Sequence, residues 1–482
     1  MLKMQTVLHI PESSMQEVIQ QLCQIDKLSQ PLLQTKVMAI LKKYYADMDE
    51  TFVKEVISAM SESSILTYCV KDGPLGTAKK RAAYVRRELP LVNPVEYVVK
   101  QGTKPLTYVP IIPMLQKLLN KSGVLDKAMS EKVHIPAEYR SYTGGQYFNE
   151  NSLLVRDEFT AALGLYIDDF ELANPLGTLN LKHKMCVVYW VIAKIPSEYR
   201  STLNLIQLPL LCNSSTVKEC GYAKVLQPLI YDLRFLKQNG VHLDQLGASV
   251  KGTVLYVAAD KLGAHSLAGF FKSFADDKFC RFCSASSSDT LQQEVCSGFF
   301  QLRDKESHDK QVQEVSEDPR LSQAYGVKGA CPLKNLEHFH VVTGYTPDIL
   351  HDVLEGIVSA ELSLCLIDLI GKRHFTFNML NQTMRHFNYT YTDKTDRPQM
   401  IGKGFSSKGT IGGNAQENWC LIRLLPFLIG HCVPEGDNTW EILMLLKDIT
   451  ELAGILKRHC ISWSVKYQST GTCYSQYFQL FI

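Results

Sequence analysis

The sequence predicts a mixed α/β fold, because three apolar, strand-like runs are followed or separated by helical patterns. The runs are AALGLYIDDF (161–170), KMCVVYWVIA (184–193) and KGTVLYVAAD (251–260). Strands that are apolar along their whole length are typically covered on both faces, as in α/β domains. Between the second and third runs, residues 223–240 have helical periodicity, and Gly240 closes the predicted helix.

The composition is that of a globular protein with more than one folding unit. The chain has 482 residues, of which 45% are hydrophobic and 10% aromatic, and a prior of about 150 residues per domain suggests about three units. The formal net charge of +2 shows no strongly basic nucleic-acid binder in the total, although a local basic face stays open. We expect neither a signal peptide nor a membrane span, because the start lacks the charged-then-apolar plan and no apolar run reaches about 18 residues.

Residues 1–150 are expected to form a helical N-terminal region. Residues 14–62 carry apolar side chains at three- and four-residue spacing, which predicts helices. The run KKRAAYVRREL (79–89) predicts a basic helix that either contacts phosphate or is a solvated surface. From residue 90 to 150 the sequence alternates Pro, Gly and Tyr with short helical patterns.

After the third strand run, the sequence predicts a polar segment and then helices. The stretch 284–327 is rich in Ser, Gln, Asp and Glu, so we expect an inserted or flexible segment. The helical patterns that follow are 348–370, 414–430 and 441–457. The last twenty or so residues have no clear period, and we expect little order there.

Two of the strand runs end in acids, at Asp168 and Asp260. Two carboxylates on neighbouring strand ends can share divalent cations, and Mg²⁺ or Mn²⁺ suits oxygen ligands. Glu417, near the start of a predicted helix, would supply a third carboxylate. Two metal ions about 4 Å apart would activate a water and stabilise the leaving oxygen of a phosphodiester. Acids at strand ends are common, and Asp169 leaves the choice within the doublet open.

Cys280 and Cys283, in CRFC, are the one closely spaced pair among the 14 cysteines. A C-x-x-C bend directs two thiolates at one ion, which suits Zn²⁺. Downstream, four polar residues share one helix face: Asp348, His351, Asp352 and Glu355. A zinc ion held by the two cysteines, His351 and either His338 or His340 would attach an insertion to the core. The alternative is a pair of free thiols and a helix face turned to solvent.

Four segments, taken in this order, carry a resemblance to a known family. They are YIDDFELANPLG (166–177), VLYVAADKLGAHSLAGFF (254–271) followed by CRFC, YGVKGACPLKNLEHFHVVTGYTPDILHDVLEG (325–356) and KGTIGGNAQENWCLIRLLPFLIGHCVPEGD (408–437). Together they resemble a DDE-type cut-and-paste transposase of the CACTA (En/Spm-like) group. They look more like the transposase-derived reading frames of fish and other animal genomes than like the group at large. The resemblance covers roughly residues 90–457.

The resemblance implies an RNase H-like core with a zinc-stapled insertion. The implied regions are 151–435 for the core, about 275–345 for the insertion, and 436–482 for a C-terminal helix and a poorly ordered tail. It implies Asp168, Asp260 and Glu417 as catalytic acids that hold Mg²⁺ or Mn²⁺. It also implies a structural Zn²⁺ site that combines C-x-x-C (Cys280 and Cys283) with an acid-x-x-His element (Asp348 and His351), to which His340 is added.

The implied activity is DNA phosphodiester hydrolysis by metal-activated water, followed by attack of the freed 3′-hydroxyl on target DNA. Lys and Arg side chains would position the DNA backbone without reading its sequence. The implied partners are transposon ends, target DNA and further copies of the chain, in the nucleus. The chain departs from the family in its low net charge and in the lack of a paired Cys/His finger near its N-terminus. The alternative is an inactive, truncated or non-enzymatic derivative that binds DNA or protein.

Two other enzyme classes fit the sequence poorly. The doublet His351-Asp352 would suit a metal-dependent phosphohydrolase, but that class is mostly helical, and the strand runs argue against it. No G-x-x-x-x-G-K-[ST] motif occurs, so a P-loop nucleotide hydrolase is not expected. The glycine-rich GTIGGN (409–414) precedes a predicted helix without a strand before it, and Asn414 is the expected N-cap.

Overall fold

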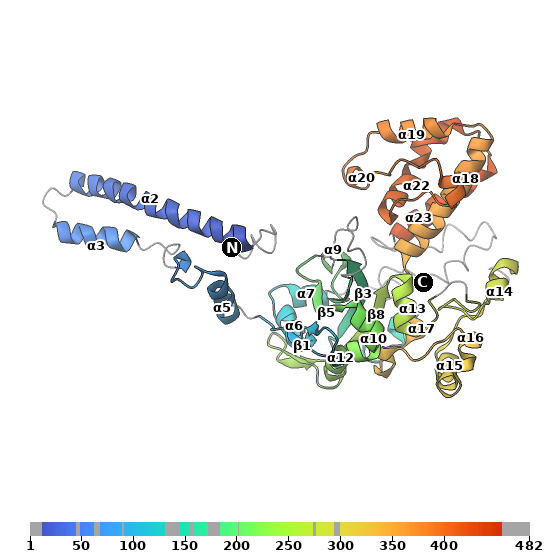
Figure 1. Cartoon of the computed structure of the whole chain (residues 1–482), viewed down its shortest axis with the longest axis horizontal. Helices are drawn as coiled ribbons and strands as arrows, with labels where there is room; N and C mark the ends of the chain where they lie inside the picture. Colours follow the sequence, from blue (N-terminus) through green and yellow to red (C-terminus); the bar gives the residue numbers. More distant parts are fainter. Residues whose placement is uncertain are drawn as a thin grey trace. The chain divides into compact units, whose positions relative to one another are not determined.

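The computed structural model describes residues 12–44, 49–61, 68–88, 91–130, 142, 145–154, 158–171, 184–200, 202–272, 276–293 and 299–455. They belong to two compact units, Met1–Asn93 and Pro94–Ile482, coloured by sequence in Figure 1. The C-terminal tail, for which the sequence predicts little order, lies outside the described residues. In the part of the chain that is described, no helix is both long and apolar enough to cross a membrane.

The first unit is helical, as the patterns at 14–62 and 79–89 predict. Its helices are α2 (Glu12–Tyr44), α3 (Glu50–Ser61) and α5 (Ala78–Glu88). The basic run 79–89 therefore forms a helix, but one of its arginines, Arg81, is buried. The Arg81 guanidinium donates to Gln16 Oε1 and to the Leu75 carbonyl, both at 2.9 Å. This arginine holds the unit together instead of facing a phosphate.

The second unit contains a mixed sheet, which confirms the α/β class. The order is β1 (Val95–Tyr97), β2 (Leu106–Tyr108), β5 (Gln207–Asn213), β4 (Lys184–Ile192), β3 (Ala161–Glu171) and β8 (Gly252–Ala259). Neighbouring strands are antiparallel except β3 and β8, which are parallel. A separate hairpin joins β6 (Val241–Leu243) and β7 (Ala248–Val250). The three predicted strand runs are thus β3, β4 and β8.

The outer edge of β8 is covered by a segment from much later in the chain. Tyr345 forms a single parallel bridge with Val257, and the Thr346 amide donates to the Val257 carbonyl at 3.1 Å. This contact brings the start of the downstream helices next to the end of β8. The end of the predicted insertion is therefore a neighbour of β8, the last strand before it.

Each face of β3 packs in a different hydrophobic cluster, because alternate side chains point to opposite faces. Leu163, Leu165 and Ile167 lie in the main core with residues of α6 (Ile111–Leu119) and α12 (Gln227–Gln238). Ala162 packs on the other face, with Leu255 and with residues near α8 (Gln146–Asn149). The face on which a residue of β3 lies therefore determines which hydrophobic cluster its side chain contacts.

A second hydrophobic core is built from helices alone. It contains π-helix η5 (Ile349–Ile357), α18 (Val358–Gly371), α19 (Phe377–His386), α22 (Ala415–Ile429) and α23 (Asn438–Ile455). Figure 1 shows α18, α19, α22 and α23 gathered into one bundle. The three long helices predicted at 348–370, 414–430 and 441–457 are confirmed. The first of them begins as a π-helix, which the sequence pattern did not indicate.

Shorter helices make the connections. They are α7 (Val124–Met129), α9 (Ser197–Arg200), α10 (Ser214–Cys220), α11 (Tyr222–Val225), α13 (Lys261–Ala268), α14 (Ser287–Gln292), α15 (Lys305–Glu317), η3 (Pro319–Leu321), α16 (Ser322–Tyr325), η4 (Pro332–Asn335), α17 (Val341–Gly344), α20 (Thr392–Thr395), α21 (Phe405–Lys408) and η6 (Gly430–Cys432). The polar stretch 284–327 thus contains helical segments. Within it, α15 buries Val312 and Val315, so a few apolar residues at helical spacing are enough to anchor this segment.

Candidate functional site

The structure brings two of the predicted catalytic acids together. Strands β3 and β8 run parallel, and the last pair in their register is Ile167 with Ala259. The next residues along the two strands are Asp168 and Asp260. Strand β8 ends there, whereas β3 continues to Glu171 beside β4, so Asp168 and Asp260 lie on neighbouring strands at the end of β8.

The two acids of the doublet lie on opposite faces of β3. The Tyr166 hydroxyl donates to Asp168 Oδ2 at 3.1 Å, which places Asp168 on the Tyr166 face. Asp169 Oδ1 accepts from Ser214 Oγ at 3.1 Å, and its Oδ2 lies 3.6 Å from Lys184 Nζ. Asp168 and Asp169 therefore have different neighbours, and the charge of Asp260 acts on the Tyr166 hydroxyl to which Asp168 is bonded.

The pKa of the Tyr166 phenol is affected by the charges around it. Burial raises its pKa, and the nearby charges of Asp168, Asp348 and Asp260 raise it further. Three carboxylates from three separate segments thus act on a single hydroxyl. Such a cluster of like charges is stabilised when a cation neutralises it.

Asp260 is held in place by the turn into α13. It is the N-cap of that helix, and its Oδ1 accepts from the Gly263 amide at 2.6 Å. A Cβ at position 263 would lie 2.6 Å from the same oxygen, so glycine is what leaves room for the carboxylate. This N-cap bond fixes the direction of the Asp260 side chain.

The polar helix face predicted around His351 lies on π-helix η5. Asp348 is its N-cap, and His351 Nδ1 is 2.5 Å from Asp348 Oδ2. Burial lowers the pKa of His351, but the bond to Asp348 and the charges of Asp348, Glu355 and Asp260 raise it overall. Asp352 Oδ1 lies 3.7 Å from Lys261 Nζ. A π-helix is a feature found frequently at functional sites.

Glu417 is the predicted acid whose carboxylate has other partners. It forms a capping box with Asn414, confirming that residue as the N-cap of α22. Glu417 Oε2 accepts from the Asn414 amide at 2.9 Å, and Oε1 accepts from Gln399 Nε2 at 3.1 Å. Glu355 Oε1 accepts from the Ala415 amide at 3.1 Å, and so connects this helix end to η5.

The donor sets fit the expected metals to different extents. Among the described residues, no three His, Cys, Asp or Glu side chains are grouped so that they could hold a metal ion. Asp168 and Asp260 are hard oxygen donors of the kind that Mg²⁺ and Mn²⁺ take. Glu417 would have to release its present hydrogen bonds to join them. The role of Glu417 therefore stays a prediction.

The CRFC turn is shaped for a thiolate. The amides of Phe282 and Cys283 donate to Cys280 Sγ at 3.3 and 3.4 Å. The hydrogen bond with the Cys283 thiol and these amides lower the pKa of Cys280 to about 6, against the effect of burial. The same hydrogen bond and burial raise the pKa of Cys283. A thiolate at neutral pH is the form that binds zinc, so Cys280 fits the predicted zinc site as it stands, whereas Cys283 would have to lose its proton to the ion.

The histidine half of that site is not brought to the cysteines. His340 Nε2 lies 3.3 Å from Asp309 Oδ1, and its Nδ1 accepts from the Val342 amide at 3.1 Å. His338 Nε2 is 3.8 Å from Glu337 Oε1, and His351 is paired with Asp348. The zinc ion and its third and fourth ligands stay predictions.

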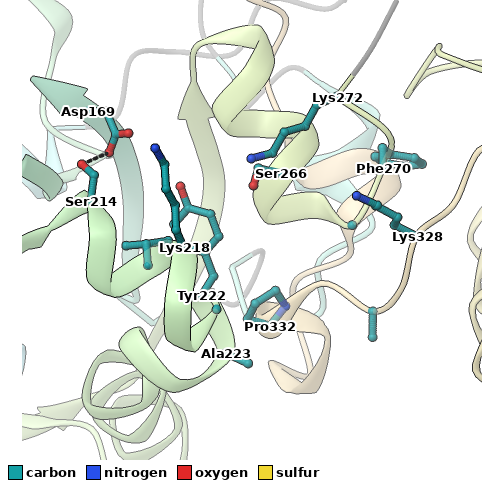
Figure 2. A pocket seen from close by; sticks show the side chains of 14 residues that line it. Asp169, Ser214, Lys218, Tyr222, Ala223, Ser266, Phe270, Lys272, Lys328 and Pro332 are labelled. Atoms are coloured by element: carbon teal, nitrogen blue, oxygen red, sulfur yellow. Dashed lines mark hydrogen bonds between the residues drawn. The ribbon is translucent and has the colours of Figure 1, made fainter. Parts of the chain in front are cut away.

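A basic pocket lies on the other face of β3 and was not predicted. It has a volume of about 520 Å³ and is lined by, among others, Asp169, Ser214, Lys218, Tyr222, Ser266, Lys272 and Lys328, which Figure 2 shows from close by. Its three lysines come from segments far apart in the sequence. No local spacing pattern links them, so only the fold reveals the pocket.

Comparison with known proteins adds no family to this picture. No protein-family model and no curated protein matches the chain. The chemistry of the site is therefore inferred from its own geometry: an acidic edge formed by Asp168 and Asp260, and a basic pocket behind Asp169.

Proposed function

We propose that the chain is a transposase-like protein in which Asp168 and Asp260 hold divalent metal ions for DNA phosphodiester hydrolysis and strand transfer. The observation that carries the proposal is the parallel pairing of β3 with β8, which puts the two acids at one sheet edge. The antiparallel series β3–β4–β5, extended by a parallel β8 beside β3, supports an RNase H-like core. In such a core the two acids come from neighbouring strands.

The residues of the site have distinct tasks in this proposal. When bound, the metal ions supply an activated water and stabilise the charge on the leaving oxygen. Asp260, fixed by the Gly263 amide, and Asp168, fixed by the Tyr166 hydroxyl, present carboxylate oxygens in set directions. Glu417 would be the third ligand if its carboxylate gave up the Asn414 amide and Gln399.

A non-enzymatic derivative that binds DNA or protein is the second candidate. The observation that favours it is the engagement of both Glu417 oxygens in local hydrogen bonds. If Glu417 keeps the capping box, two carboxylates remain for the metal ions, and hydrolysis would be slow or absent. The fold and the basic pocket would still serve binding.

Nicking of supercoiled plasmid separates the two candidates. We expect the purified chain to nick DNA with Mg²⁺ or Mn²⁺, to stop when EDTA is added, and to lose activity in Asp260→Asn. Asp244→Asn is the matched control, because Asp244 is exposed in the β6–β7 turn and removes the same charge. Folded wild-type protein that never nicks would favour the non-enzymatic candidate, and nicking that survives Asp260→Asn would overturn the two-acid site.

Zinc is the structural part of the proposal. We expect about one zinc ion per chain in purified protein, lost in Cys280→Ser and kept in Cys432→Ser, which changes a partly buried cysteine in η6. Metal analysis after dialysis measures this. Wild-type protein free of zinc would mean that CRFC is a pair of thiols.

A further inference from the structure

We propose that the basic pocket behind Asp169 binds phosphate groups of a DNA strand and holds that strand next to Asp260. The identity of the ligand as DNA rests on the proposed function, whereas the affinity for phosphate does not. The pocket has a volume of about 520 Å³, which is enough for more than a single phosphate group. The acid site formed by Asp168 and Asp260 does not account for this basic pocket.

Three lysines from separate segments surround the pocket. Lys218 is in the last turn of α10, Lys272 follows α13, and Lys328 lies between α16 and η4. Figure 2 shows Lys218 and Tyr222 on one wall, with Ser266 and Lys272 across from them. Ammonium and hydroxyl groups are thus available from both sides of the opening.

The positive charge of this pocket is not compensated by its own wall. In the described part of the chain, none of Lys218, Lys272 and Lys328 forms an ion pair with a carboxylate, and Lys328 lies 5.8 Å from the Phe271 ring centre. The one acid in the wall, Asp169, already has Lys184 and Ser214 as partners. Uncompensated like charges around a concave surface attract a polyanion.

The backbone holds two of the lysine segments against each other. The Lys328 amide donates to the Gly269 carbonyl at 2.7 Å, and Phe270 forms an antiparallel bridge with Val327. Gly269 has a φ of +83°, and a Cβ there would lie 2.1 Å from the Gly329 carbonyl oxygen. Glycine is therefore required at this turn, and the positions of Lys272 and Lys328 follow from it.

The lining favours a phosphate backbone over bases. Its cationic side chains are all lysines, which act as point charges on phosphate and read no sequence. Of its two aromatic residues, Phe270 is only 3% exposed and so is not available to stack on a base, and Tyr222 is partly buried. The ligand implied is one that the pocket binds mainly through its phosphates.

The pocket lies within electrostatic reach of the acid site. Burial raises the pKa of Tyr222, and the charges of Cys186, Asp169 and Asp260 raise it further. The fold agrees with this, because Asp260 is the N-cap of α13 and the same helix contributes Ser266 to the pocket wall. A strand bound by the lysines would therefore have a neighbouring phosphodiester close to the acids.

The test measures DNA binding in EDTA, where no hydrolysis can occur. A fluorescent single-stranded oligonucleotide is titrated with wild type and with Lys218→Gln/Lys272→Gln/Lys328→Gln, at several salt concentrations. Loss of three phosphate contacts should lower the slope of log affinity against log salt by about 2, and low-salt affinity by about tenfold or more. The matched control, Lys100→Gln/Lys104→Gln/Lys121→Gln, removes the same charge from the β1–β2 loop and from the turn after α6, outside the pocket lining, and the β1–β2 hairpin lies at the sheet edge opposite β8. Equal binding by the two triple variants would overturn the proposal.

Inorganic pyrophosphate distinguishes a strand from a small anion. If pyrophosphate binds the pocket by calorimetry while the oligonucleotide binds both triple variants equally, the pocket takes small phosphates, and the DNA assignment is overturned.

Plasmid nicking separates this inference from the proposed function. Wild type that never nicks, with binding lost only in the pocket variant, supports the pocket and not the catalysis. A pocket variant that binds and nicks like the control overturns the pocket and leaves the catalysis.

Discussion

The two faces of β3 at its acidic end carry opposite charge, although their residues alternate along one strand. On one face, Asp168 bonds to Tyr166, and Asp260 and Asp348 act on the same phenol. On the other face, Asp169 is compensated by Lys184 and lines a pocket with three lysines. The period of two in a β-strand is what allows one acidic doublet to serve two different surfaces.

The difference has a chemical consequence. Clustered carboxylates favour a cation, and clustered ammonium groups favour an anion. An enzyme that cuts phosphodiesters needs both, a metal site for the reacting bond and a basic surface for the rest of the strand. The comparison therefore predicts that the two faces can be disabled separately.

The largest effect on DNA nicking is expected from substitutions in the doublet Asp168-Asp169. Asp168→Asn should reduce metal-dependent nicking by at least about 100-fold, because it removes a metal ligand, and even the outer partners of such ligands are worth 10–100-fold. Asp169→Asn should leave most of the activity, because Asp169 faces the lysines and not the other acids. Initial rates on supercoiled plasmid measure both.

The reverse result would exchange the two faces. If Asp169→Asn abolished nicking and Asp168→Asn did not, the metal ions would lie on the lysine side. Circular dichroism on both variants is the control for folding, since Asp169 bonds to Ser214 and its loss could loosen the start of α10.

A change in packing should affect the Asp168 face alone. A Cβ at Gly164 would lie 2.3 Å from the ring of Tyr256, so Gly164→Val forces that partly buried ring to move. Overpacking of this kind costs about 2 kcal/mol. Urea unfolding measures the loss, and the affinity of the lysine pocket for the oligonucleotide should stay unchanged.

A double-mutant cycle tests whether the contact with Tyr256 causes the loss of stability in Gly164→Val. In a Tyr256→Ala background the ring is gone, so Gly164→Val should cost about 1 kcal/mol less than in the wild type. An equal cost in both backgrounds would mean that the strand itself, and not the contact with Tyr256, makes glycine necessary.

Much of the sheet could be predicted because its long central strands are apolar throughout. Strands β3, β4 and β8 and the helices after them follow from periodicity, and the acids at the ends of β3 and β8 follow from the same pattern. Strands β1 and β2 have three residues each, too few for a period. Strand β5 contains Pro209, which lowers its strand propensity in any sequence-based estimate. The sequence consequently puts the end of the N-terminal region near 150, whereas the compact units divide at Asn93.

The site is less predictable than the sheet because it depends on partners far away in the sequence. Asp168 and Asp260 could be named, since each follows a strong strand pattern. The lysine pocket could not, because Lys218, Lys272 and Lys328 meet only in the fold. The hydrogen bonds that engage Glu417 involve Gln399, and no spacing rule connects these two residues.

The smallest effect expected is a change in the pKa of His351. Asp348 raises the pKa of His351 through a direct bond, so Asp348→Asn should lower it. A raised folded pKa means that the charged pair stabilises the protein fully below the unfolded pKa of about 6.5 and that this stability is lost as pH rises through the folded pKa. Because the imidazole is half exposed, solvent screening keeps the contribution below about 1 kcal/mol.

Proton NMR of the His351 ring over pH 5 to about 8 measures the shift directly. Asp352→Asn is the matched control, because Asp352 pairs with Lys261 and removes the same charge from the same helix. A lower His351 pKa in Asp348→Asn, and a smaller change in the control, would assign the raised value to the direct bond. Equal shifts in both variants would instead mean that the pKa of His351 depends on the summed charge of the nearby acids, Asp260 included. The contrast between the two faces of β3 would then depend on long-range charge and not on individual contacts.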